Sequence, residues 1–295
     1  MADFSEYTEP YEKHQLMKDY VCDLVQHSEL IPIQQIERMS NCGEWLTFRE
    51  SEDKLQLVGA SFCRQRICPM CQWRKAERQF SNCVQIADYL TKQDYRFLHV
   101  VLTCKNCNGG KELTDTVQLL YRAFAQLMKQ ERPKRAFKGV LRTLEVSYNY
   151  DTRQFHPHLH CLVAVNKSYF NDSKNYISYE LLTEMWTDCL KQSIPAMCSI
   201  GAVKNNLGFA EVSKYCLKPL KLNEIYENDN LYILAELHAT LKGARFVQYY
   251  GVIRQARKAL KIKDEDELDE SGELDNKKNI VYHYNHTRSR YEQMS

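Results

Sequence analysis

The chain has 295 residues, of which 44% are hydrophobic and 26% are charged, a composition typical of a soluble globular protein. No apolar run approaches the length of a membrane span. The N-terminus has neither the basic region nor the apolar region of a secretory signal. We therefore expect a cytoplasmic protein with no membrane partner, whose cysteine thiols stay reduced.

The formal net charge of +2 hides an uneven distribution. The segment from Asp264 to Asp275 holds eight acidic residues and no basic one, and the rest of the chain then carries 40 basic against 30 acidic side chains. A basic body is typical of proteins that bind the phosphate backbone of a nucleic acid. A solvated acidic linker beside an ordinary surface explains the charge equally well.

Hydrophobic patterning predicts alternating helices and strands. Residues 1–40 have a helical pattern, and a cysteine-bearing module with two short strand-like runs follows at 41–80. Residues 96–104 are rich in β-branched and aromatic side chains and predict a buried strand. The remaining predictions are a helix from Thr114 that stops before Pro133, an antiparallel hairpin of residues 139–148 and 158–165, helices at 179–191, 209–218 and 231–241, and an edge strand at 245–252.

Two histidines at the start of a predicted strand are the most informative feature. His158 and His160 are separated by Leu159, and side chains alternate between the faces of a strand, so both imidazoles point to the same side. Two imidazoles on one face can hold a divalent cation. On the neighbouring strand Glu145 is a candidate third ligand and would favour Mg²⁺ or Mn²⁺. His156 points to the same face and is the rival third ligand.

A polar stripe follows on the predicted helix at 209–218. Positions four and seven residues apart share a helix face, so Glu211, Tyr215 and Lys218 lie on one side. A tyrosine between a carboxylate and an ammonium group has the ingredients of an activated nucleophile. Alone, such a stripe is more often a solvated helix face.

Three motifs in order resemble the replication initiators of rolling-circle plasmids, within the HUH endonuclease superfamily. They are a hydrophobic strand ending in threonine (97–103), the HPHLH strand (156–160) and a YxxK helix (215–218), and they span roughly residues 96–219. Each motif is common alone, but the ordered set is specific. Glu211, four residues before Tyr215, is similar to the branch that pairs one tyrosine with one glutamate.

The resemblance implies a metal-dependent, site-specific single-strand endonuclease. Tyr215 would attack the scissile phosphate at the double-strand origin, leaving a 5′-phosphotyrosyl adduct and a 3′-hydroxyl primer. Lys218 would orient the phosphate, and Glu211 would activate water to end the cycle. The implied partners are origin DNA, partly single-stranded, and a host helicase and polymerase.

The resemblance also implies an α+β fold. We expect an open antiparallel sheet with a ferredoxin- or RRM-like arrangement, the histidine strand in the centre, and helices on one face. The predicted organisation is an N-terminal helical segment at 1–40, the cysteine module at 41–80, the nicking domain at 95–262, and an acidic segment with a C-terminal tail at 263–295.

Four cysteines of the module have the spacing of a structural metal site. Cys42, Cys63, Cys68 and Cys71 supply four thiolates, with two predicted strands in the long gap, as in a zinc ribbon. Four protein ligands leave no open position, so the Zn²⁺ would be structural. Buried cysteines without metal are the alternative. Four basic residues surround this module and are candidate DNA contacts, namely Arg64, Arg66, Arg74 and Lys75.

Two other functions compete with the plasmid initiator. A relaxase or transposase of the same superfamily would catalyse DNA strand transfer by similar chemistry. Relaxases, however, usually have their tyrosine before the histidines in the sequence. A non-enzymatic zinc protein that binds nucleic acid explains the cysteines and the basic body. It gives no reason for the HPHLH strand followed by the Glu211, Tyr215, Lys218 stripe.

Overall fold

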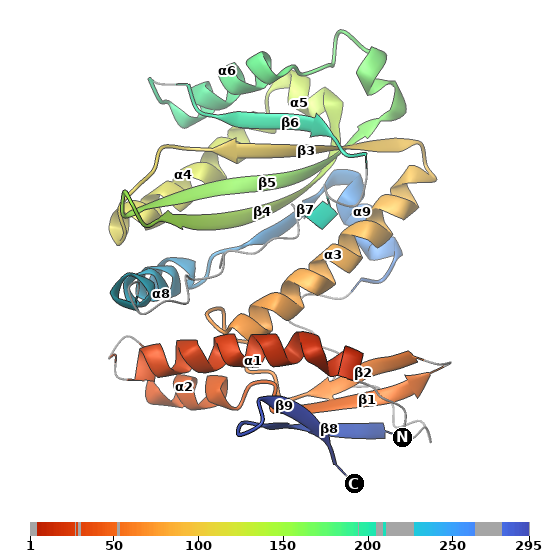
Figure 1. Ribbon diagram of the computed structural model, residues 1–295. Coiled ribbons are helices and arrows are strands. Elements are labelled where there is room, and N and C mark those ends of the chain that lie inside the picture. The colour runs from red at the N-terminus through yellow and green to blue at the C-terminus, as the bar shows by residue number, and fades with distance from the viewer. Residues whose placement is uncertain are drawn as a thin grey trace. The chain divides into compact units, whose positions relative to one another are not determined.

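The structure is a computed structural model that describes residues 5–26, 28, 31–51, 54–193, 195–204, 209–210, 227–262 and 279–294 (Figure 1). The chain divides into two compact units. Unit 1 comprises residues 1–75, 221–235 and 263–295, and unit 2 comprises residues 76–220 and 236–262. Each unit is described by itself. Among the described residues, no helix is both long and apolar enough to cross a membrane.

Unit 2 is built on a five-stranded antiparallel sheet with the order β6-β3-β5-β4-β7. Its strands are β3 (Tyr95–Thr103), β4 (Phe137–Asn149), β5 (Gln154–Asn166), β6 (Cys198–Ala202) and β7 (Val247–Tyr250). The hairpin predicted around the histidines is β4–β5, and β7 is the expected edge strand. The histidine strand β5 is central, which confirms its predicted place in an α+β fold with an antiparallel sheet.

Both faces of this sheet are covered, because its central strands are apolar on both sides. Helix α4 (Lys111–Leu127) buries Val117, Leu120 and Phe124 and contacts β5 from one face. On the other face lie α3 (Pro69–Thr91) and α9 (Gly251–Ala259) (Figure 1). Their buried side chains form a core with Leu141 and Leu162. The expectation of helices on one face was therefore wrong.

Helix α3 was not predicted beyond the cysteine module. Its buried positions Cys83, Ile86, Ala87 and Leu90 recur at helical spacing and pack in the core of unit 2. The predicted helices at 179–191 and 231–241 correspond to α6 (Tyr179–Leu190) and α8 (Glu227–Leu241). Two short elements complete the described part of this unit, α5 (Glu131–Ala136) and the 3-10 helix η1 (Lys167–Asn171).

Unit 1 joins the two ends of the chain. Its four-stranded antiparallel sheet has the order β2-β1-β8-β9, so the C-terminal hairpin pairs with the first strand of the cysteine module. The C-terminal tail is thus part of a sheet from residue 279 onward. The elements that lie wholly in this unit are α1 (Ser5–Gln26), α2 (Ile33–Ser40), β1 (Trp45–Ser51), β2 (Lys54–Ala60), β8 (Asn279–Asn285) and β9 (Arg290–Gln293). Residues 69–75 of α3 and 227–235 of α8 also belong to it.

Two glycines let α9 begin directly against β4. Gly139 and Gly251 face each other in an isolated antiparallel bridge. A Cβ at Gly139 would lie 2.7 Å from the backbone nitrogen of Ile253, and a Cβ at Gly251 would overlap the carbonyl oxygen of Lys138. Gly251 also has φ +55°, a conformation that favours glycine. This close approach positions Ile253 of α9 in the core shared with Leu141.

We predict that Gly251→Ala lowers the free energy of unfolding by about 2 kcal/mol or more, because the new methyl group adds a backbone clash to the cost of a positive φ. Gly243→Ala is the matched control, since Gly243 has φ +79° with nothing within 4 Å of the added Cβ. Thermal unfolding followed by circular dichroism checks both variants. If both variants lost equal stability, the close approach of Gly251 to β4 would contribute nothing to the free energy of unfolding.

Candidate active site

Glu145, His158 and His160 form a compact cluster on one face of the sheet. Glu145 lies opposite His158 in the pairing of β4 with β5, and His160 follows two residues later on the same face. The Oε2 atom of Glu145 lies 2.7 Å from His160 Nε2 and 3.2 Å from His158 Nε2. All three side chains are buried, and one potential ligand atom of each lies within 4.8 Å of the others.

Hydrogen bonding prepares His158 to bind a cation. Its Nδ1 lies 3.0 Å from the carbonyl oxygen of His156, which can only accept, so a neutral His158 carries its proton on Nδ1. The lone pair of Nε2 then faces the Oε2 atom of Glu145. Two electron-rich atoms this close require a cation between or beside them, either a proton or a metal ion. One carboxylate and two imidazoles are a donor set that fits Mg²⁺ or Mn²⁺.

His156, the rival third ligand, has other contacts. It lies opposite Ser147, and its Nδ1 is 2.7 Å from Oδ1 of Asn106. The side chain that touches both imidazoles is the Glu145 carboxylate. The arrangement therefore favours Glu145 over His156 as the third donor.

His99 belongs to the same cluster and was missed by the sequence analysis. Its Nε2 lies 3.1 Å from Nδ1 of His160, and the two rings are parallel with centroids 5.4 Å apart. This contact fixes the His160 ring so that Nε2 points to Glu145. His99 lies in the predicted buried strand at 96–104, four residues before Thr103 and therefore on the same strand face, which was the available signal.

Tyr215, Glu211 and Lys218 lie outside the residues that the structure describes, as does most of the predicted helix at 209–218. Phe209 is described, and its ring packs edge-on against Phe97 with centroids 6.0 Å apart. Phe97 lies on β3 two residues before His99, on the face that carries the Glu145, His158, His160 cluster. Phe209, which precedes Tyr215 by six residues in the sequence, is therefore attached to that face.

The four cysteines of the module form a second cluster, in unit 1. All four are buried, and their Sγ atoms lie within 4.8 Å of one another. Cys42 follows α2 and Cys63 follows β2, whereas Cys68 precedes α3 and Cys71 lies in its first turn. The second pair thus lies at a helix start and not in a second hairpin, which differs from a simple ribbon.

The cluster favours thiolate character at Cys71. Hydrogen bonds from the Cys42, Cys63 and Cys68 thiols hold the pKa of Cys71 below its ordinary value. The backbone N–H of Arg64 also donates to Cys71 Sγ at 3.2 Å. Burial raises the pKa of Cys68. The backbone N–H of Cys63 likewise donates to Cys42 Sγ at 3.3 Å. Four convergent sulfurs, with backbone N–H donors to two of them, are the donor set of a tetrahedral soft-metal site.

The four basic residues around the cysteines have different surroundings. Arg64 is exposed, whereas Arg66 and Lys75 are half-buried. The Arg74 guanidinium lies over the rings of Tyr11 and Trp73, 5.6 and 5.7 Å from their centroids. Their contact with DNA stays a prediction.

Comparison with known proteins identifies the family of this chain. A family model described as "Replication protein" matches residues 54–292, which include Glu145, His158 and His160 and every cysteine of the second cluster except Cys42. The chain belongs to this family, the replication proteins of rolling-circle plasmids, which confirms the resemblance seen in the sequence motifs. Its role is that of a plasmid replication initiator.

Several curated relatives are named "Protein rep". One from Streptococcus pneumoniae serotype 2 (strain D39 / NCTC 7466) is 33% identical over 271 residues, covering 87% of this chain and 83% of the relative. One from Lactiplantibacillus plantarum is 30% identical, covering 81% and 80%. One from Lentilactobacillus hilgardii is 29% identical, covering 82% and 80%. No solved structure matches the chain.

Proposed function

We propose that this replication protein starts rolling-circle replication by nicking one strand of the plasmid origin with Tyr215 as the nucleophile. The observation that carries the proposal is the buried cluster of Glu145, His158 and His160 on a sheet face to which Phe209 is attached. Tyr215 follows Phe209 by six residues, so its Cα lies within about 22 Å of that of Phe209 whatever the intervening conformation. If the segment is helical, the rise is only about 9 Å.

The protein residues divide into those that hold the phosphate and those that react with it. Glu145, His158 and His160 would hold a divalent cation, Mg²⁺ or Mn²⁺, which when bound polarises the scissile phosphate and offsets charge on its oxygens. His99 keeps the His160 ring in its orientation through the 3.1 Å contact between ring nitrogens. Lys218 contacts the phosphate oxygens as a positive charge.

In the first step the Tyr215 hydroxyl oxygen attacks the phosphorus atom, and the bond from phosphorus to the 3′-oxygen breaks. The phenol loses its proton, and the departing oxygen gains one to become a 3′-hydroxyl, from which a polymerase extends. The 5′-phosphate stays on Tyr215 as a phosphodiester of tyrosine. In the last step Glu211 takes a proton from water, which attacks the phosphotyrosine and releases the phenol.

The DNA substrate is origin DNA with a single-stranded stretch at the nick, since an attacking tyrosine needs an accessible backbone. A host helicase and polymerase then act on the nicked product. The Cys42, Cys63, Cys68, Cys71 cluster would hold a structural Zn²⁺, and Arg64, Arg66, Arg74 and Lys75 around it would contact the DNA backbone.

We predict that Tyr215→Phe abolishes both nicking and the covalent protein–DNA adduct, because it removes the attacking oxygen and keeps the ring. Glu211→Ala should still nick but release the adduct slowly, by roughly 10²–10⁴-fold, since general-base assistance is lost. A denaturing gel with a labelled origin oligonucleotide and Mn²⁺ measures both. Tyr179→Phe, at an exposed tyrosine of α6, is the control. Adduct formation by Tyr215→Phe would show that another residue is the nucleophile.

We also predict that Glu145→Gln slows nicking by roughly 10²-fold or more, because the amide cannot supply the negative oxygen that a hard cation requires. His156→Asn should nick nearly as the parent does, since His156 lies beside Asn106. Rates on supercoiled plasmid across a Mn²⁺ titration distinguish the two. If His156→Asn lost nicking while Glu145→Gln nicked at the parental rate, the assignment of the third ligand would be reversed.

For the cysteine cluster, we predict one tightly bound zinc per chain, lost in Cys71→Ser together with thermal stability. Cys22→Ala, at a buried cysteine outside the cluster, should retain the metal. Elemental analysis after extensive dialysis against metal-free buffer checks both proteins. A parent protein without zinc would leave the four thiols as ordinary buried cysteines.

A further inference from the structure

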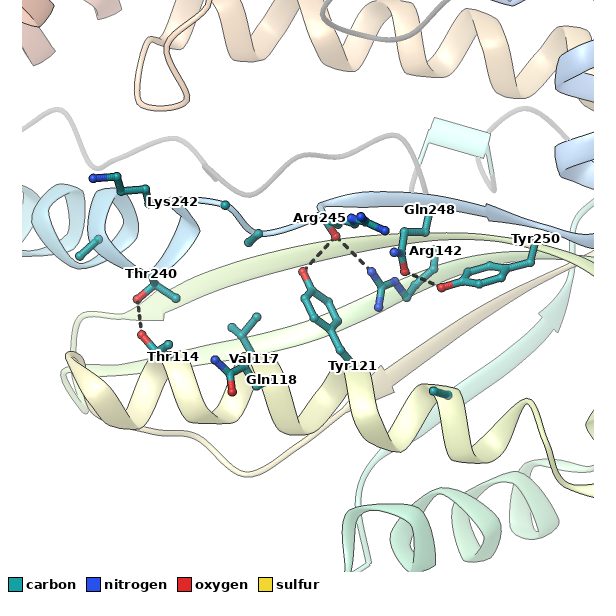
Figure 2. Close-up of a pocket in the computed structure, with 14 residues that line it drawn as sticks. Thr114, Val117, Gln118, Tyr121, Arg142, Thr240, Lys242, Arg245, Gln248 and Tyr250 are labelled. Atoms are coloured by element: carbon teal, nitrogen blue, oxygen red, sulfur yellow. Dashed lines mark hydrogen bonds between the residues drawn. The ribbon is translucent and has the colours of Figure 1, made fainter.

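A cavity of about 550 Å³ lies in unit 2 and uses the sheet face opposite the Glu145, His158, His160 cluster. It is bounded by α4, the last turn of α8, the loop at 242–245, and strands β4 and β7 (Figure 2). Arg142 enters it from β4, where it alternates with Leu141 and Thr143 of the cluster's face. The mechanism proposed above uses none of its lining residues.

The charges around the cavity are all positive. Arg142, Lys242 and Arg245 line it, and none of the described lining residues carries a carboxylate. Lys242 and Arg245 are exposed at its rim, whereas Arg142 is only 2% exposed. An anion entering this space would meet cations at the rim and a fixed guanidinium at the base.

Arg142 is buried without a carboxylate partner in the cavity. Its guanidinium lies 4.0 Å from the centroid of the Tyr121 ring, and its Nη2 donates to the carbonyl oxygen of Arg245 at 3.1 Å (Figure 2). Its Nε has no hydrogen-bond partner within the described part of the chain. Burying a guanidinium is costly unless it is paired. Ring and carbonyl contacts offset part of that cost and orient the group, and an anion would complete the set.

Size and aromatic character point to more than a small inorganic ion. The volume falls in the range of roughly 300–1,000 Å³ typical of small-molecule sites. The half-buried Tyr121 and the 37%-exposed Tyr250 provide ring surface beside the cations. Tyrosine rings next to arginine are the combination that holds a base and its phosphate in single-stranded nucleic acids.

We propose that this cavity binds a nucleotide unit, with its phosphate on Arg142, Lys242 and Arg245 and its base against Tyr121 and Tyr250. Arginine pairs with phosphate through two parallel N–H donors, and the stacked Arg142 is already held for such a contact. The unit is either one nucleotide of a DNA strand or a free nucleoside phosphate. The site does not depend on the metal or on Tyr215.

The test measures binding of thymidine 5′-monophosphate, thymidine and an oligothymidylate strand to the full chain in EDTA, so that catalytic metal binding has no influence. We expect Lys242→Ala/Arg245→Ala to weaken the phosphate-bearing ligands about tenfold or more. Both side chains are exposed, and the Arg245 carbonyl that accepts from Arg142 remains. Lys92→Ala, at an exposed lysine outside the cavity, should bind like the parent.

Arg142→Lys should also weaken binding of the phosphate-bearing ligands about tenfold, since lysine keeps the charge but lacks the planar guanidinium with its paired N–H donors. If the cavity variants bind the monophosphate more weakly than the parent does, the site is assigned to a free nucleotide. If they weaken binding of the strand alone, the site is assigned to DNA. The proposal is overturned if neither the monophosphate nor the strand binds more weakly to the double variant than to Lys92→Ala. It is also overturned if thymidine, which has no phosphate, binds as tightly as the phosphate-bearing ligand that the site holds. Either result is independent of whether Tyr215 nicks DNA.

Discussion

The pairing of β4 with β5 is the constraint on which the candidate site depends. It places Glu145 opposite His158 and brings the carboxylate within 3.2 Å of both imidazoles. A shift of the pairing register by one residue would turn either the Glu145 carboxylate or the two imidazoles to the opposite face of the sheet. That face is the apolar layer under α4, where burying a charge is costly. The apolar residues around the cluster therefore fix its geometry, since Leu144 and Leu159 must both face that layer. The chemistry of the site and the burial of the core are specified by one register.

Local pattern was enough to predict this hairpin. The alternation of His158, Leu159 and His160 gave the face, and the adjacent strand gave Glu145 as a candidate, although it left His156 open. The structure favours Glu145, because His156 instead contacts Asn106, which comes from a distant loop. His99 was missed because its position on the strand face of Thr103 points to the site only once β3 is known to lie beside β5.

The parts that sequence reasoning missed are those decided by distant contacts. The pairing of β1 with β8 joins residues more than two hundred positions apart, and an acidic segment separates the C-terminal strands from the rest of the sequence. Helices lie on both sheet faces because α3 continues beyond the cysteine module, to which only its start was assigned. Nothing in the local sequence marks Arg142, and only the approach of Tyr121 and Arg245 makes it the base of a cavity. Burial of such a group is a tertiary property.

Glu145 and His160 are close together in the sequence, and this sets the order in which parts of the candidate site form during synthesis. Hairpins close within about 1–10 μs, and β3, already synthesised, supplies the third strand that a stable sheet needs. At about 5–20 residues per second, the ribosome takes roughly 3–11 s to proceed from His160 to Tyr215. The nascent chain thus has time to bring Glu145, His158 and His160 together well before Tyr215, the proposed nucleophile, is synthesised. Assembly of the proposed cation site and synthesis of the proposed nucleophile are separate stages, in an order set by the position of two motifs along the gene.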